Sequence, residues 1–71
     1  MFNLKNHFNA MSVDEREQFA QRADIPLATI HRQYIYRTRT PRPKRMRALA
    51  NAAGVPVTEI AAFFLQEKEG P

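Results

Sequence analysis

The chain has 71 residues, enough for one small domain and too few for two. It has no cysteine, which excludes disulfides and thiolate metal sites and leaves one small apolar core to supply its stability. Its 11 Lys and Arg outnumber its seven Asp and Glu, giving a net charge of +4. No apolar run approaches the roughly 20 residues that span a bilayer, and no signal-peptide pattern is present, so we expect a cytoplasmic protein.

Two short helices are expected before residue 24. Asn3 can cap the first, whose apolar residues recur at i, i+4 and i+7: Leu4, Phe8 and Met11. Ser12 and Glu15 have the spacing of a capping box and predict a second helix from about Val13 to Ala23. The acidic residues at its start suit the positive end of the helix dipole, so we assign them no catalytic role.

A tight break followed by a third helix is predicted next. Asp24 tolerates a left-handed backbone and can form the turn. Pro26 suits the first position of a helix that we expect to run from about Pro26 to Tyr36, and Leu27, Ile30 and Tyr34 form its apolar stripe. Two helices joined by a short turn, the second with an exposed polar face, form the plan of a helix-turn-helix.

Four residues carry a resemblance to a known motif: Ala20, Asp24, Ile25 and Ile30. Their spacing is similar to that of the lambda-repressor/Cro type of helix-turn-helix, and residues 3–54 resemble small Cro-like prophage regulators of the YdaS type. The family usually has Gly in place of Asp24 and an aliphatic residue in place of Gln33. Either Tyr34 or Ile35 must then fill that core position, and the phase of the third helix stays open between them.

The remaining chain predicts two further helices. Two prolines keep residues 38–42 out of a helix interior. A fourth helix is expected from about Pro43 to Ala53, ended by Gly54, and a fifth, capped by Thr58, is expected to reach about Glu67. The predicted fold class is all-α, a compact bundle of about five short helices containing the helix-turn-helix.

The basic residues are concentrated in one stretch. No Asp or Glu lies between Asp24 and Glu59, whereas seven of the eleven Lys and Arg lie there. Such segregation produces a one-sided positive field that attracts polyanions. We expect five of these side chains, in the loop after the third helix and at the start of the fourth, to contact DNA phosphates: Arg37, Arg39, Arg42, Lys44 and Arg45.

The third helix is the candidate for reading DNA bases. An α-helix fits the major groove, where Arg pairs with guanine, Gln with adenine and a methyl group with thymine. The residue types favour Thr29, His31, Arg32, Gln33 and Tyr36, and the resemblance implies Ala28, Thr29, His31 and Arg32. The candidate base-contacting set is therefore Ala28, Thr29, His31, Arg32, Gln33 and Tyr36.

The aromatic pair near the C-terminus suggests a subunit interface. Consecutive helical residues point about 100° apart, so Phe63 and Phe64 do not easily enter the same small core. We expect one of them to pack inward, and the other, with Leu65, to contribute to a dimer interface. The alternative is that both belong to the core, since a domain this small needs every aromatic side chain.

These features together predict a sequence-specific DNA-binding transcriptional regulator. The resemblance implies a homodimeric phage or prophage repressor, associated with the nucleoid of a bacterial or phage-infected cell, that blocks a promoter by occupying a symmetric operator. The two alternatives are an RNA-binding protein and an antitoxin-like protein-interaction module. The RNA-binding protein would use the basic arm, which is the stretch that contains the five predicted phosphate-contacting residues. No catalytic residue, metal, cofactor or small-molecule ligand is expected, because nucleophile–base pairs, glycine-rich phosphate loops and clustered metal ligands are missing from the sequence.

Overall fold

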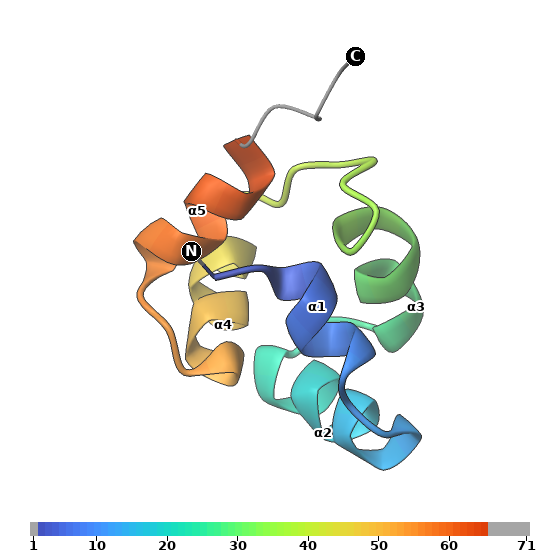
Figure 1. The fold of residues 1–71 in the computed structure, drawn as a ribbon. Coiled ribbons are helices and arrows are strands. Elements are labelled where there is room, and N and C mark those ends of the chain that lie inside the picture. Colours follow the sequence, from blue (N-terminus) through green and yellow to red (C-terminus); the bar gives the residue numbers. More distant parts are fainter. Residues whose placement is uncertain (1, 66–71) are drawn as a thin grey trace.

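Short helices and tight turns make up residues 2–65, the part of the chain that the computed structural model describes (Figure 1). The elements in order are α1 (Leu4–Asn9), α2 (Val13–Ala23), α3 (Leu27–Thr29), η1 (Ile30–Tyr34), α4 (Pro43–Ala53) and α5 (Val57–Leu65). Because η1 directly follows α3, these elements form five helices. Residues 2–65 contain no strand, and the all-α prediction is confirmed.

The predicted helix starts are confirmed at α1, α2 and α4. The side chain of Asn3 accepts a hydrogen bond from the backbone N–H of Asn6 over 3.0 Å. The N–H of Ser12 donates to Oε1 of Glu15 over 2.8 Å, and the N–H of Glu15 donates to Oγ of Ser12 over 3.2 Å, which completes the capping box. The hydrogen bond from the Ser12 backbone, followed by one with its side chain, lowers the pKa of Glu15.

The end of α4 is also as predicted, whereas the start of α5 is not. Gly54 ends α4 in the left-handed region, with φ of 73°. Thr58 lies inside α5 and is not its cap, because the N–H of Glu59 already bonds to the carbonyl oxygen of Pro56 over 3.0 Å and the helix begins at Val57. The predicted end near Glu67 lies outside the described residues.

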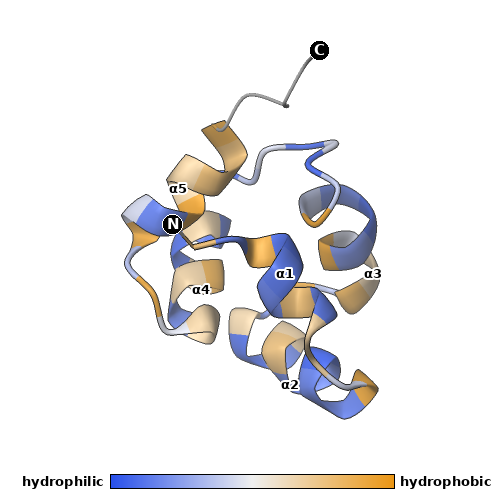
Figure 2. Ribbon diagram, viewed as in Figure 1, coloured by the Kyte–Doolittle hydropathy of each residue, from blue (hydrophilic) through white to orange (hydrophobic). Residues whose placement is uncertain are grey.

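The core lies where α1, α2, η1, α4 and α5 meet. Helix α4 packs against both α2 and α5, and Figure 2 shows that α5 is largely hydrophobic, whereas much of the α2 ribbon is hydrophilic. The largest fully buried side chains come from all five helices and from the residue after η1: Phe8, Phe19, Phe63, Leu4, Ile30, Ile35, Leu49 and Ile60. Burial of these side chains is the main source of stability in a chain without disulfides.

No single helix within residues 2–65 has both the length and the hydropathy needed to cross a membrane. The pair of α4 and α5 reaches that length and composition only together, and the two helices meet at an angle of 117°.

Candidate nucleic-acid interface

The break between α2 and α3 is closed by backbone hydrogen bonds. Asp24 lies in the left-handed region, with φ of 54° and ψ of 43°, as its sequence position predicts. Its N–H bonds to the carbonyl oxygens of Ala20 and Gln21, and the N–H of Ile25 bonds to the same carbonyl of Ala20 over 3.2 Å. The side chain of Ile25 is buried. The chain therefore leaves α2 and enters α3 through a turn that is held by these backbone hydrogen bonds and by the burial of Ile25.

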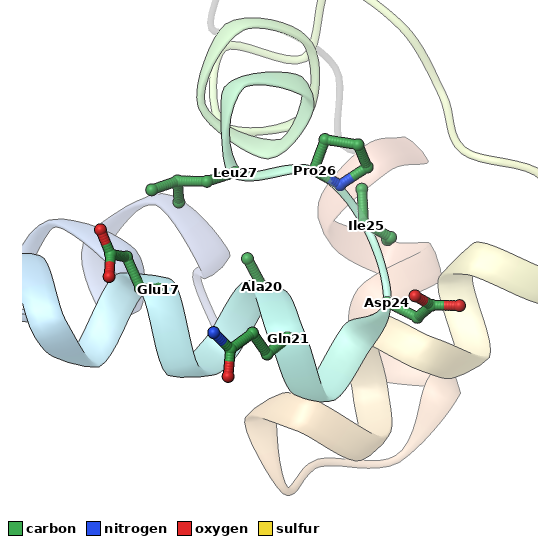
Figure 3. A pocket seen from close by; sticks show the side chains of 7 residues that line it. All are labelled: Glu17, Ala20, Gln21, Asp24, Ile25, Pro26 and Leu27. Atoms are coloured by element: carbon green, nitrogen blue, oxygen red, sulfur yellow. The ribbon is translucent and has the colours of Figure 1, made fainter.

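A hollow of about 430 Å³ lies beside this turn, and Figure 3 shows the side chains around it. It is lined by Glu17, Ala20, Gln21, Asp24, Ile25, Pro26 and Leu27. The methyl group of Ala20 points toward α3 from the middle of α2 (Figure 3) and is buried. Because Glu17 and Asp24 place carboxylates on the rim, this hollow repels phosphate, and we do not include it in the interface.

The helix formed by α3 and η1 widens after its first turn. The N–H of Ile35 bonds to the carbonyl oxygen of Ile30 over 2.9 Å, an i to i−5 bond typical of π-helical geometry. The extra residue per turn brings both Tyr34 and Ile35 into the core, with exposed fractions of 4% and 1%. The two residues thus share the core position left open by Gln33. The helix predicted from about Pro26 to Tyr36 is present from Leu27 to Tyr34, and the π-helical geometry of its second half was not predicted.

All six candidate base-contacting residues lie at the surface of α3, η1 and the turn that follows. Four are exposed and two are half-buried: Ala28, His31, Arg32 and Tyr36, and Thr29 and Gln33, respectively. The structure therefore places the whole predicted set on one continuous segment. Tyr34 is in the core, as its place in the predicted apolar stripe indicates, whereas Tyr36 has an exposed fraction of 54%.

Side chains of α1 contact two of the candidate base-contacting residues. The imidazole of His31 stacks on the ring of Phe8, with centroids 6.1 Å apart, and lies 5.8 Å from the ring of Tyr36. The ammonium group of Lys5 lies over the same tyrosine ring, 5.6 Å from its centroid. These contacts restrain His31 and Tyr36, although both keep solvent-facing surface.

Three of the predicted phosphate-contacting residues surround one cavity. Arg39, Arg42 and Arg45 line a cavity of about 370 Å³ together with Gln33, Tyr34, Thr40 and Pro41. Nη1 of Arg45 donates a hydrogen bond to the hydroxyl oxygen of Tyr34 over 3.0 Å. Lys44 lines another hollow, together with Arg22 and Asp24, and Arg45 lines both hollows. The basic arm thus borders two hollows that share Arg45.

The fifth predicted phosphate contact, Arg37, has a different environment. Its backbone is left-handed, with φ of 57°, and its side chain is half-buried. The guanidinium lies 5.0 Å from the ring centroid of Phe63, and Nη1 donates to the carbonyl oxygen of Phe63 over 3.4 Å. We infer that Arg37 joins the end of η1 to α5. The two residues are 26 positions apart, so no local sequence pattern indicated this contact.

Sequence reasoning also missed a basic residue on α2. The guanidinium of Arg16 lies 4.9 Å from the ring centroid of Phe8, and its Nε donates to the carbonyl oxygen of Phe8 over 3.2 Å. Arg16 lines a cavity of about 330 Å³ with His31 and Arg32. The acidic neighbours of Arg16 in the sequence concealed its position next to the candidate base-contacting residues.

The aromatic pair follows the alternative in which both rings belong to the core. Phe63 and Phe64 are both buried, with exposed fractions of 1% and 9%. Their rings meet edge to face, and the ring of Phe64 also meets that of Tyr34 edge to face, with centroids 5.9 Å apart. Protein covers α5 toward both α4 and η1, so two directions about 100° apart are both inside the core. Only Leu65 of the predicted interface is exposed, with an exposed fraction of 77%.

Comparisons of the chain with models of protein families, with curated proteins and with solved structures gave no match. Within residues 2–65, no group of three or more His, Asp and Glu side chains is arranged to hold a metal ion.

Proposed function

We propose that the protein is a sequence-specific DNA-binding transcriptional regulator in which α2, the turn at Asp24, and α3 with η1 act as a helix-turn-helix. One observation carries this proposal. The segment formed by α3 and η1 contributes residues to two cationic cavities, one lined by Arg16 and Arg32 and the other by Arg39, Arg42 and Arg45. Among the described residues, no carboxylate lines either cavity.

This arrangement suits duplex DNA. A helix that enters the major groove has a phosphate backbone on each side, and the groove is about 12 Å wide. Arg16 at one cavity and the three arginines at the other would position the segment by binding phosphates, while Arg32 and the other exposed side chains of the segment face base edges. Gln33 links the two roles, because it belongs to the candidate reading set and also lines the second cavity.

The proposed roles follow from the chemistry of each side chain. Arg32 is exposed and can form paired hydrogen bonds with a guanine edge, and the amide of Gln33 can do the same with adenine. Ala28 and Thr29 supply methyl groups for contact with thymine. By occupying its operator, the protein would exclude polymerase from an overlapping promoter, which requires no cofactor.

We further propose that the protein binds as a homodimer to a two-fold symmetric operator. Two reading segments would then enter successive major grooves about 34 Å apart, one helical turn of DNA. Since Phe63 and Phe64 belong to the core, an interface on α5 would have to use its exposed apolar side chains, Val57 and Leu65. Sedimentation of wild type and Leu65→Ser, with and without DNA, tests this: a wild type that remains monomeric on DNA contradicts the dimer.

Selection of bound sequences from a random pool of duplex DNA tests the main proposal. We expect a consensus of two half-sites, and affinity for it well above that for a scrambled duplex at physiological salt. Titration with single-stranded RNA of the same length, at the same salt concentration, separates the alternative. Preference for RNA, or the absence of any enriched sequence, would contradict a sequence-specific DNA-binding regulator.

A further inference from the structure

The cavity lined by Arg39, Arg42 and Arg45 is more than a basic surface. It lies between η1, the loop after it and the first turn of α4, and three arginines line one volume of about 370 Å³. Within the described chain no carboxylate lines this cavity, so the three exposed arginines give it a positive field that attracts anions. The lining also includes the amide of Gln33 and the hydroxyl of Tyr34, which are hydrogen-bonding groups without charge.

Tyr34 gives this cavity a fixed donor. Its side chain is almost fully buried, with an exposed fraction of 4%, and the edge-to-face contact with Phe64 holds its ring. A phenolic hydroxyl carries one hydrogen and two lone pairs. Because Arg45 donates to the oxygen over 3.0 Å, that bond uses a lone pair and leaves the phenolic hydrogen available to an acceptor in the cavity. The same bond restrains the guanidinium of Arg45, whose other N–H groups remain donors.

The start of α4 adds to the positive field near this cavity. The residue before the helix is Arg42, and in the described chain its side chain makes no capping hydrogen bond, unlike Asn3 before α1 and Ser12 before α2. Pro43 has no N–H, so the first free backbone donors of α4 belong to Lys44 and Arg45. The positive end of the helix dipole therefore reinforces the field of the three guanidiniums.

We propose that this cavity is a binding site for a phosphate ester, held by Arg39, Arg42 and Arg45 and by the hydroxyl of Tyr34. Planar guanidiniums match the oxygens of a phosphate in paired hydrogen bonds, and the tyrosine supplies a further donor in a fixed position. The volume is within the range of small-molecule sites, so it accommodates the phosphate together with the sugar that carries it. The phosphate belongs either to the DNA backbone, in which case the inference rests on the proposed function, or to a free nucleotide.

Binding of small phosphates tests the site itself. Inorganic phosphate and adenosine 5′-monophosphate are titrated separately at constant ionic strength, balanced with sodium chloride, while the backbone amide signals of residues 33–45 are followed by NMR. We expect saturable shifts for wild type with the nucleotide. Tyr34→Phe keeps the ring against Phe64 and should weaken binding about tenfold, because it removes one hydrogen bond to a charged group. Arg42→Ala should weaken binding at least as much.

Arg47→Ala is the matched control, since it removes the same charge from an exposed position of α4 that does not line the cavity. It should change the affinity for the nucleotide by less than about twofold, as expected for a screened charge at a distance. Unsaturable shifts in wild type, or equal losses in Arg42→Ala and Arg47→Ala, would show general charge attraction and overturn the site. The thermal midpoint of each variant confirms that it is folded.

Duplex DNA distinguishes the two sources. If the phosphate is part of DNA, inorganic phosphate displaces the selected duplex more effectively than chloride at the same ionic strength, and Tyr34→Phe abolishes that difference. If the nucleotide binds but no duplex does, the site stands, its ligand is a free phosphate ester, and the proposed function fails. If DNA binds equally to wild type and Tyr34→Phe while the nucleotide binds to neither, the site is overturned and the proposed function stands.

Discussion

The imidazole ring of His31 lies nearly parallel to the phenyl ring of Phe8, with their planes 22° apart. Phe8 is on α1 and is fully buried, whereas His31 is exposed on η1. The stack therefore connects the candidate reading segment with the core through a helix that contributes no residue to the predicted DNA contacts. Two functions of His31, supporting the segment and contacting a base, can be separated by substitution.

We expect His31→Ala to lower the free energy of unfolding by about 1 kcal/mol, the typical value of an aromatic pair. His31→Phe retains a planar ring for stacking and removes both ring nitrogens, so its stability should remain near that of wild type. Urea denaturation of both variants measures these effects. On the selected operator, loss of affinity in His31→Phe would assign a base contact to the imidazole nitrogens. Equal stability of wild type and His31→Ala would show that the stack contributes nothing.

A second prediction concerns the close approach of α2 and α3 at Ala20. This side chain is buried and points from α2 toward α3 (Figure 3), so a larger side chain crowds the contact between the two helices. We expect Ala20→Leu to destabilise the protein by about 1–3 kcal/mol, the usual cost of overpacking. Gln18→Leu, at an exposed position of the same helix, should change stability by less than about 0.5 kcal/mol. Comparable stability of the two variants would mean that the approach is not tight.

The left-handed backbone at Asp24 predicts that glycine raises the free energy of unfolding there and lowers it inside α2. Asp24 has φ of 54°, a conformation that costs a residue with a Cβ about 1 kcal/mol or more, and its carboxylate lies at the negative end of the α2 dipole. Asp24→Gly removes both costs and should raise the free energy of unfolding by up to about 1 kcal/mol. Gln18→Gly, inside the same helix, should lower it by about 1 kcal/mol. Thermal unfolding of both variants checks the signs, and destabilisation by Asp24→Gly would contradict this account.

Most of the fold could be predicted from local patterns. Asn3, Ser12 and Gly54 mark helix ends through interactions within four residues, so the sequence contains the relevant information. The π-helical turn was not predictable in the same way. Its widening depends on Ile30 and Ile35 both reaching the core, which is decided by helices distant in sequence. The burial of both Phe63 and Phe64 likewise depends on what surrounds α5.

The sequence predicted which residues belong to the candidate site, but it did not predict how their side chains are arranged in space. The absence of acidic residues between Asp24 and Glu59 located the basic stretch correctly, but it could not show that Arg39, Arg42 and Arg45 line one cavity. Arg37 faces α5 because of an interaction over 26 positions, and Arg16 reaches Phe8 from a segment that appears acidic. Side chains as long as arginine have many rotamers, and tertiary packing selects among them.

The capping box at the start of α2 predicts a pH dependence. Hydrogen bonds from the backbone and the side chain of Ser12 lower the pKa of Glu15 below its ordinary value of 4.5. Because the folded-state pKa is below the unfolded one, this interaction stabilises the fold above about pH 4.5 and is lost as pH falls through the folded-state pKa. Urea denaturation of wild type and Glu15→Gln between pH 7 and pH 3 should show a stability difference that diminishes below the ordinary pKa. A constant difference would contradict the assignment.

The final prediction distinguishes base reading from phosphate binding. Arg32 is exposed on η1 within the candidate reading segment, whereas Lys44 is exposed in the first turn of α4. If Arg32 pairs with a guanine, Arg32→Ala should weaken binding to the selected operator by about 1–3 kcal/mol and relax the preference at one position of each half-site. Its effect on a scrambled duplex should be small, because base edges contribute little to non-specific binding.

Lys44→Ala should act in the opposite way, because binding to a phosphate carries no sequence information. Affinity should fall to the same degree on the operator and the scrambled duplex, and the slope of log K against log salt should become shallower by about 0.9 for each phosphate that the variant no longer neutralises. Titrations of both variants on both duplexes at several salt concentrations measure these effects. If Arg32→Ala weakens both duplexes equally, Arg32 binds phosphate, and base reading falls to Thr29, Gln33 or His31. If neither variant alters DNA binding, α3 and η1 do not form the reading helix of a helix-turn-helix.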